Sequence, residues 1–131
     1  MPFGWVQTAF FISKTLEMIY NIYHISAKNT HMNTEQASHL FESLSSPIRL
    51  AIFQVLSAMG TQGMVAGDLA KQLNLSPNHL SFHLKTLNHA GLVTSQQEGR
   101  FVRYYANLNL MMDLTRFLTQ NCCLHSHEQC C

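Results

Sequence analysis

The stretch from Val65 to Ala90 constrains the fold most, because two short amphipathic segments follow one another there across a four-residue break. Apolar side chains recur at helical spacing on both sides of the break, at Leu69, Ala70 and Leu73 and then at Leu80, Leu84 and Leu87. In the break, Ser76 is a good N-cap residue and Pro77 suits the first position of a helix. A short helix, a turn and a second capped helix predict a helix-turn-helix, whose second helix enters the major groove of DNA. Two packed helices of another kind would show the same periodicity, so this interpretation depends on the rest of the chain.

The composition limits both the size and the charge of the protein. The chain has 131 residues, of which 47% are hydrophobic, enough for one domain with a buried core and short extensions. Only 11% are charged and the formal net charge is +1, which excludes a broadly basic surface. Contacts with DNA must therefore come from a few locally placed cations, multiplied by dimerisation, to which the eight histidines could add positive charge.

The sequence has no pattern typical of an enzyme. It contains no Ser/His/Asp order, no glycine-rich loop that would cradle a phosphate and no paired carboxylates that stand out. We therefore expect a binding protein and not an enzyme.

All four cysteines lie within the last ten residues. A secreted scaffold instead distributes its cysteines so that disulfides join distant elements. The N-terminus also lacks a basic region and an evident small-residue cleavage site, so no signal peptide is expected. These features predict a reducing, cytoplasmic compartment.

The first 31 residues differ from the rest of the chain, because they are rich in aromatic and β-branched residues. Lys14 and Glu17 interrupt the apolar run, so a membrane span is not expected, whereas an interfacial or partner-binding helix is an alternative. A third interpretation is that translation begins at Met32, since residues 19–25 would be encoded by AT-rich triplets like those of promoter DNA. We therefore divide the chain into an extension (1–31), a folded domain (32–121) and a cysteine-rich tail (122–131).

The domain around the helix-turn-helix is predicted to contain further helices and one β-hairpin. We expect a first helix that is capped by Thr34 and ends before Ser45, and a central helix that is capped by Ser46 and has Pro47 in its first turn. A loop is expected at 60–63, and two strands at 92–95 and 101–105 are expected to flank a turn at 96–100. The last helix is expected to run from Leu108 to Thr119. Gly91 is expected to end the second helix of the helix-turn-helix. This order predicts a mainly α fold with a small hairpin (α+β), a winged helix-turn-helix. Arg100 and Arg103 on the wing could reach a phosphate or the minor groove, although a hairpin with a purely structural role is the alternative.

Three segments of the domain, LSSPIRLAIFQVL, GDLAKQLNLSPNHLSFHLKTLNHAGLV and EGRFVRYYANL, carry a resemblance to a known family. They resemble the ArsR/SmtB family of bacterial metal- and metalloid-responsive repressors, and the resemblance covers roughly residues 33–121. It implies a homodimer, built on the first and last helices, that binds operator DNA and represses an operon until an inducer binds.

The same resemblance assigns the recognition helix. The residues that it would present to DNA are Asn78, His79, Ser81, Phe82, His83 and Lys85. Those near the N-terminal end of the helix can donate to or accept from base edges, whereas Lys85 suits a phosphate. Phe82 could touch a thymine methyl group. For Phe82 and His83, packing against the domain is an equal alternative.

Two inducer sites of the family have no counterpart in this sequence. Members that sense arsenite on the first helix of the helix-turn-helix carry a CVC-type motif, whereas residues 64–68 contain no thiol. Members that sense zinc across the dimer use acidic and histidine ligands on the last helix. Asp113 is present here, but Thr115 and Arg116 follow it without a histidine. The inducer must therefore bind elsewhere.

The tail together with the residue before it, NCCLHSHEQCC (121–131), offers thiolates that thiophilic ions prefer. It resembles the C-terminal cysteine site of arsenite repressors, which implies As(III) or Sb(III) as the inducer. The candidate ligands are Cys122, Cys123 and Cys130, with Cys131 as a substitute. Because His125 and His127 lie between the pairs, a Zn²⁺ or Cd²⁺ site is an alternative. A thiol-redox or persulfide switch, a metal-buffering tail and a tail without a role are further alternatives.

Overall fold

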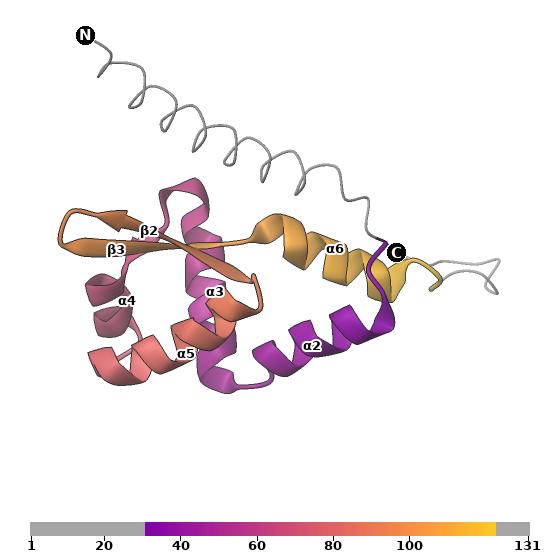
Figure 1. Ribbon diagram of the computed structural model, residues 1–131, viewed down its shortest axis with the longest axis horizontal. Helices are drawn as coiled ribbons and strands as arrows, with labels where there is room; N and C mark the ends of the chain where they lie inside the picture. The colour runs from indigo at the N-terminus through magenta and orange to yellow at the C-terminus, as the bar shows by residue number, and fades with distance from the viewer. Residues whose placement is uncertain (1–30, 123–131) are drawn as a thin grey trace, which may run out of the picture. The chain divides into compact units, whose positions relative to one another are not determined.

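Five α-helices and a small antiparallel sheet make up the part of the chain described by the computed structural model, residues 31–122 (Figure 1). In chain order the elements are α2 (Thr34–Leu44), α3 (Pro47–Met59), the 3₁₀ turn η1 (Gly60–Gln62), β1 (Met64–Val65), α4 (Ala66–Gln72), α5 (Pro77–His89), β2 (Val93–Glu98), β3 (Phe101–Ala106) and α6 (Leu108–Thr119). The predictions for residues 1–30 and 123–131 lie outside the described residues. The predicted order of helices, hairpin and last helix is confirmed, and the fold is a winged helix-turn-helix.

The helix starts follow from local capping chemistry. Ser76 and Pro77 begin α5 as predicted, and the Ser76 side chain accepts a hydrogen bond from the His79 backbone N–H at 3.3 Å. The predicted cap of α2 is wrong by one residue. Asn33, not Thr34, is the N-cap, and it exchanges two hydrogen bonds with Gln36 in a capping box. Asn33 is the cap because a capping box needs a Glu or Gln three residues after the N-cap, and Gln36 stands at that distance from Asn33 but not from Thr34.

The hydrophobic core lies between α3, the helix-turn-helix and the hairpin, and α2 and α6 also contribute buried side chains to it. Its fully buried side chains are Ile52, Leu56, Leu69, Leu80, Leu87, Leu92, Val93 and Leu114. The prediction that α3 is central is confirmed, because α3 contacts α2, α5 and β3. Leu50 on α3 is nevertheless 44% exposed, so this apolar side chain of the central helix lies outside the core.

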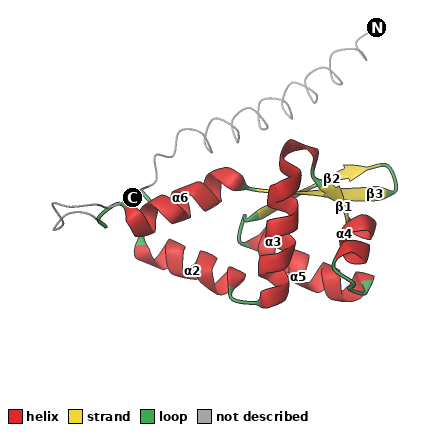
Figure 2. Ribbon diagram, turned by 180° about the vertical axis from the view of Figure 1, so that it is seen from behind, coloured by secondary structure: helices red, strands yellow, loops and turns green. Residues whose placement is uncertain are grey.

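The sheet has three strands, whereas the sequence predicts two. The strand order is β1-β3-β2, and the short β1 pairs antiparallel with β3, opposite Tyr104 and Arg103 (Figure 2). The hairpin strands are also longer than predicted, because Glu98 still pairs with Phe101. Only Gly99, with a φ of +60°, and Arg100 make the turn, so the predicted five-residue turn at 96–100 is wrong.

The predicted loop at 60–63 is a 3₁₀ turn followed by Gly63. Gly63 has a φ of +58°, and a Cβ there would lie 2.5 Å from the carbonyl oxygen of Tyr104. Glycine therefore allows β1 to approach β3 closely. Within residues 31–122, none of the helices has the length and apolar character needed to cross a bilayer.

Candidate nucleic-acid interface

The helix-turn-helix consists of α4, a four-residue turn and α5. The turn bends at Asn74, whose φ of +53° places it in the left-handed region, and Leu75 N–H donates to the Ala70 carbonyl at 2.9 Å. Leu69 on α4 and Leu80 on α5 are buried, and the two helices contact each other. The turn and this packing hold α5 at a fixed angle to α4, as recognition by a rigid helix requires.

One face of α5 is free for a partner. Of the residues predicted to meet DNA, five are exposed on this helix: Asn78, His79, Ser81, Phe82 and Lys85. Phe82 is 65% exposed, a large apolar side chain that the domain leaves uncovered. The packing alternative for Phe82 is therefore excluded within the monomer, and its ring is available for a thymine methyl group.

His83 belongs to the interior. It is 7% exposed and lies on the same helical face as Leu80, Leu84 and Leu87, so the alternative that it packs against the domain describes its position. Its Nε2 lies 3.2 Å from the Nε2 of His79. Desolvation by burial, with smaller contributions from His79 and Arg49, lowers the pKa of His83 from its ordinary value of 6.5. His83 is thus a neutral, buried side chain, and direct contact with a base edge does not fit its place.

The two arginines of the wing differ in their contacts among residues 31–122: Arg103 is held by other groups, whereas Arg100 is not. Arg100 lies in the exposed turn and makes no hydrogen bond or ion pair within residues 31–122. Arg103 is half-buried; its Nε lies 3.0 Å from the Glu98 carboxylate, and its Nη1 donates to the Gln62 carbonyl oxygen at 3.2 Å. Arg103 therefore joins the wing to η1, and Arg100 is better placed to reach a phosphate.

Sequence reasoning missed two exposed residues beside this surface. Lys71, in the last turn of α4, is an exposed cation on the helix that precedes the recognition helix. Phe101 is 62% exposed next to Arg100, although its type suggested only a strand former. Its place at the start of β3, directly after the turn, was the available signal, because side chains at a hairpin tip have little sheet to pack against.

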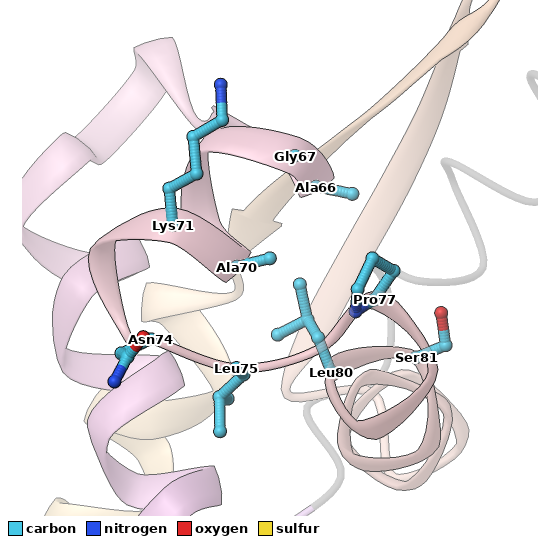
Figure 3. Close-up of a pocket in the computed structure, with 9 residues that line it drawn as sticks. All are labelled: Ala66, Gly67, Ala70, Lys71, Asn74, Leu75, Pro77, Leu80 and Ser81. Carbon is cyan, nitrogen blue, oxygen red and sulfur yellow. The ribbon is translucent and has the colours of Figure 1, made fainter.

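A surface hollow of about 450 Å³ lies between α4 and α5 (Figure 3). The lining residues are Ala66, Gly67, Ala70, Lys71, Asn74, Leu75, Pro77, Leu80 and Ser81. Lys71 extends away from the hollow, whereas Leu80 points toward it (Figure 3). The small side chains of α4 at this place leave the first turn of α5 accessible.

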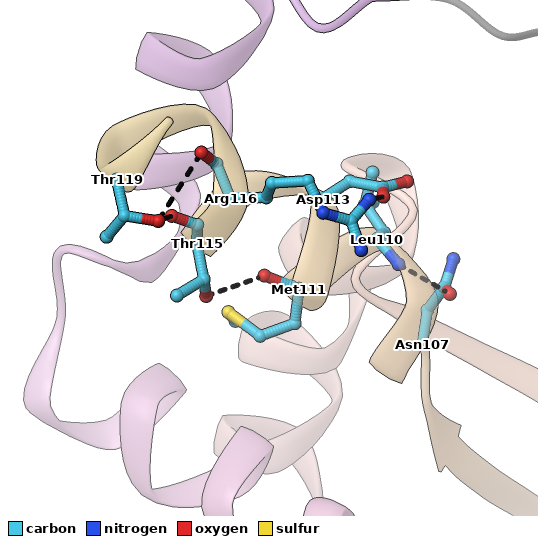
Figure 4. A network of polar contacts seen from close by, with 7 residues as sticks. All are labelled: Asn107, Leu110, Met111, Asp113, Thr115, Arg116 and Thr119. Carbon is cyan, nitrogen blue, oxygen red and sulfur yellow. Dashed lines mark hydrogen bonds and ion pairs between the residues drawn. The ribbon is translucent and has the colours of Figure 1, made fainter. Parts of the chain in front are cut away.

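The last helix offers no histidine-carboxylate site among the described residues. Asp113 pairs with Arg116 at 3.1 Å, and the Thr115 hydroxyl donates to the Met111 carbonyl at 2.9 Å (Figure 4). No group of three or more His, Cys, Asp or Glu side chains within residues 31–122 is arranged to hold a metal ion. Asp113 is thus engaged by a cation on its own helix.

Of the four candidate thiol ligands, only Cys122 falls within the described residues. It is exposed just beyond the end of α6, and its backbone N–H donates to the Thr119 carbonyl at 3.1 Å. The candidates Cys123, Cys130 and Cys131 lie outside the described residues. The tail therefore starts directly at the last helix.

A capped recognition helix with an exposed polar face, followed by a wing with a free arginine, defines a winged helix-turn-helix DNA-binding protein. A family model described as a helix-turn-helix domain matches residues 44–96. The transcriptional repressor SdpR of Bacillus subtilis is 30% identical over 76 residues, which cover 58% of this chain and 81% of that protein. The regulator YgaV of Escherichia coli is 36% identical over 72 residues, covering 55% of this chain and 71% of its own.

Solved structures give the same result. An ArsR-like transcriptional regulator from Rhodococcus sp. RHA1 is 30% identical with a TM-score of 0.58, over 66% of this chain and 78% of that chain. Reduced HlyU from Vibrio cholerae is 29% identical with a TM-score of 0.52, over 66% of this chain and 90% of that chain. The chain belongs to the ArsR family of helix-turn-helix transcriptional regulators. It is a DNA-binding transcriptional regulator.

Proposed function

We propose that this regulator is a cytoplasmic repressor that binds operator DNA as a homodimer and is released when As(III) or Sb(III) binds its C-terminal cysteines. The observation that carries the proposal is the position of the thiols. Four cysteines lie in the ten residues that begin at Cys122, directly after α6. Soft ions prefer thiolates, and a short tail can bring several sulfurs round one ion.

The homodimer is supported by the exposed apolar surface of α2 and α6. These helices contact each other and carry four of the seven large apolar side chains that are exposed within residues 31–122, namely Phe41, Leu108, Met112 and Leu118. Met112 and Leu118 are 59% and 60% exposed, and a surface of this kind favours a protein partner. A second copy would cover it symmetrically. A related fold from Mycobacterium bovis is described as homodimeric.

The link from inducer to DNA would run through α6. If the tail folds round an ion, it pulls on the end of the helix that forms the dimer surface, and the two recognition helices change their spacing. A hundredfold loss of operator affinity needs about 2.7 kcal/mol of coupling, within the usual range for allosteric proteins. A protein 27% identical to this chain, with a TM-score of 0.54, is described as a possible transcriptional regulator for arsenical resistance.

The experiment is operator release measured with the DNA upstream of the protein's own reading frame. Arsenite is expected to release the parent protein, whereas the variant Cys122→Ser/Cys123→Ser should bind the operator equally well and no longer respond. Release of this variant by arsenite would contradict the thiol site. A matched control, His125→Ala/His127→Ala, keeps the thiols and should respond like the parent.

A second candidate inducer is Zn²⁺ or Cd²⁺, which the two tail histidines favour because mixed thiolate and imidazole ligands suit these ions. In that case the histidine variant would lose its response to Zn²⁺ in the same assay. A persulfide or oxidant that releases the parent, where arsenite and metals do not, would instead favour the thiol-redox switch.

A further inference from the structure

On the recognition helix, the Nε2 atoms of two histidine side chains face each other. His79 and His83 are four residues apart on α5, one helical turn, and their Nε2 atoms lie 3.2 Å apart. Their ring centroids are 4.8 Å apart with an angle of 50° between the ring planes. At this distance one imidazole can donate a hydrogen bond to the other, and the same geometry lets both Nε2 atoms face a single metal ion.

The separation of the two nitrogens matches that of two ligands of one metal ion. A Zn–N bond is about 2.0–2.1 Å long, so two nitrogens on a tetrahedral ion lie about 3.3–3.4 Å apart. The observed 3.2 Å is within about 0.2 Å of this value. Two histidines at this spacing on one helical face are also the arrangement by which helices bind zinc in metalloproteases.

Burial holds the inner ligand in place. His83 is buried, its ring packs edge-on against Phe82, and its Nδ1 makes no hydrogen bond within residues 31–122. Packing and the contact with His79 thus orient the ring, with Nε2 directed at His79.

We propose that His79 and His83 form a binding site for one divalent transition-metal ion of the Zn²⁺ class on the recognition helix. The ion replaces the contact between the two Nε2 atoms: the imidazole that carries its proton on Nε2 takes it up on Nδ1 instead, by exchange with solvent, so that no net proton is lost and each ring binds the ion through Nε2. Water fills the remaining coordination positions, because no third protein ligand lies near among residues 31–122.

One neighbouring charge weakens the site. The Arg49 guanidinium faces His83 from α3, although it donates to the Ser43 and Glu42 carbonyl oxygens at the end of α2. Its positive charge opposes a second cation, so the site is weaker than one with three or four protein ligands. Ions that prefer oxygen ligands, such as Mg²⁺, should not bind.

The test is a Zn²⁺ titration of the full chain in which all four cysteines are serine, so that thiols cannot contribute. Competition with a coloured chelator gives the number of ions bound, and nitrogen NMR of the imidazoles identifies the ligands. We expect the Nε2 signals of His79 and His83 to shift with the first equivalent bound at this site. His79→Ala and His79→Gln should bind one ion fewer, or bind it at least about tenfold more weakly.

His89→Ala is the matched control, because His89 is an exposed histidine on the same helix. It should keep the site. Equal binding by the parent and both His79 variants, or Nε2 signals that do not move, would overturn the proposal. Because His79 is exposed, its replacement tests binding without emptying the core; circular dichroism checks that both variants remain folded.

A bound ion would also hold the His79 imidazole beside His83, where it can no longer contact DNA. Zn²⁺ should therefore lower the operator affinity of the cysteine-free protein. This consequence rests on the proposed operator contact of His79. If the ion binds but operator affinity does not change, that contact is wrong and the metal site stands.

Discussion

Replacing Arg100 by alanine is expected to weaken operator binding through a change in its salt dependence. Arg100 is the exposed cation of the wing turn, and neither a carboxylate nor a carbonyl within residues 31–122 holds its guanidinium. Each phosphate contact that is lost lowers the slope of log K against log salt by about 0.9. In a dimer two symmetrical contacts disappear, so the slope should fall by about 1.8.

This slope gives a measurable difference in affinity. When salt rises from about 50 to about 200 mM, the parent should lose about twelvefold more affinity than the Arg100→Ala variant. Fluorescence anisotropy with a labelled operator, repeated at several salt concentrations, measures both slopes. Arg116→Ala is the matched control, because Arg116 lies on α6 in an ion pair with Asp113, and α6 lies at the opposite end of β3 from the tip of the hairpin (Figure 1). Its slope should equal that of the parent.

The variant Arg103→Ala tests whether Arg100, and not Arg103, makes the phosphate contact of the wing. Its guanidinium is held by Glu98 and by the Gln62 carbonyl, so Arg103→Ala should change the salt slope by less than Arg100→Ala does. If Arg100→Ala keeps the slope of the parent while Arg103→Ala loses about 1.8, the assignment of the phosphate contact is refuted.

Three further predictions concern stability. Leu87→Ala removes a side chain that is 0% exposed, so it should lower the free energy of unfolding by about 2–5 kcal/mol, measured by urea denaturation. A loss below about 1 kcal/mol would contradict the place of Leu87 in the core. Asn33→Ala breaks the capping box of α2 and should cost about 1 kcal/mol in the same assay, and an unchanged midpoint would argue against the cap. Acidification below pH 6.5 should lower the free energy of unfolding, because burial first, then His79 and Arg49, lower the pKa of His83 and the unfolded chain therefore binds more protons. The stabilisation that depends on neutral His83 is lost progressively as the pH falls from 6.5 through the folded-state pKa, and a His83→Gln variant that keeps the full pH dependence would show that another group causes it.

The sequence determined the elements whose signals are local. Ser76 and Pro77 mark the start of α5, and the last helix spans Leu108–Thr119 in both prediction and structure. Capping and apolar periodicity act within a few residues, so they can be read without knowing what packs against a helix. Even the shift of the α2 cap to Asn33 was readable, because Gln36 stands where a capping box requires it.

Tertiary structure decided what depends on distant partners. β1 has two residues, and its existence follows only from pairing with β3, about forty residues later in the chain. Phe82 and His83 are neighbours that the sequence could not separate, yet one faces outward and the other lies inside. The reason is that a helix turns by about 100° per residue, so packing against α3 covers the face of Leu80, Leu84 and Leu87, which includes position 83 and excludes position 82. The same packing places His83 beside His79, whereas Arg103 is held by Glu98 across the hairpin and by the Gln62 carbonyl, and Arg100 lies in the exposed turn.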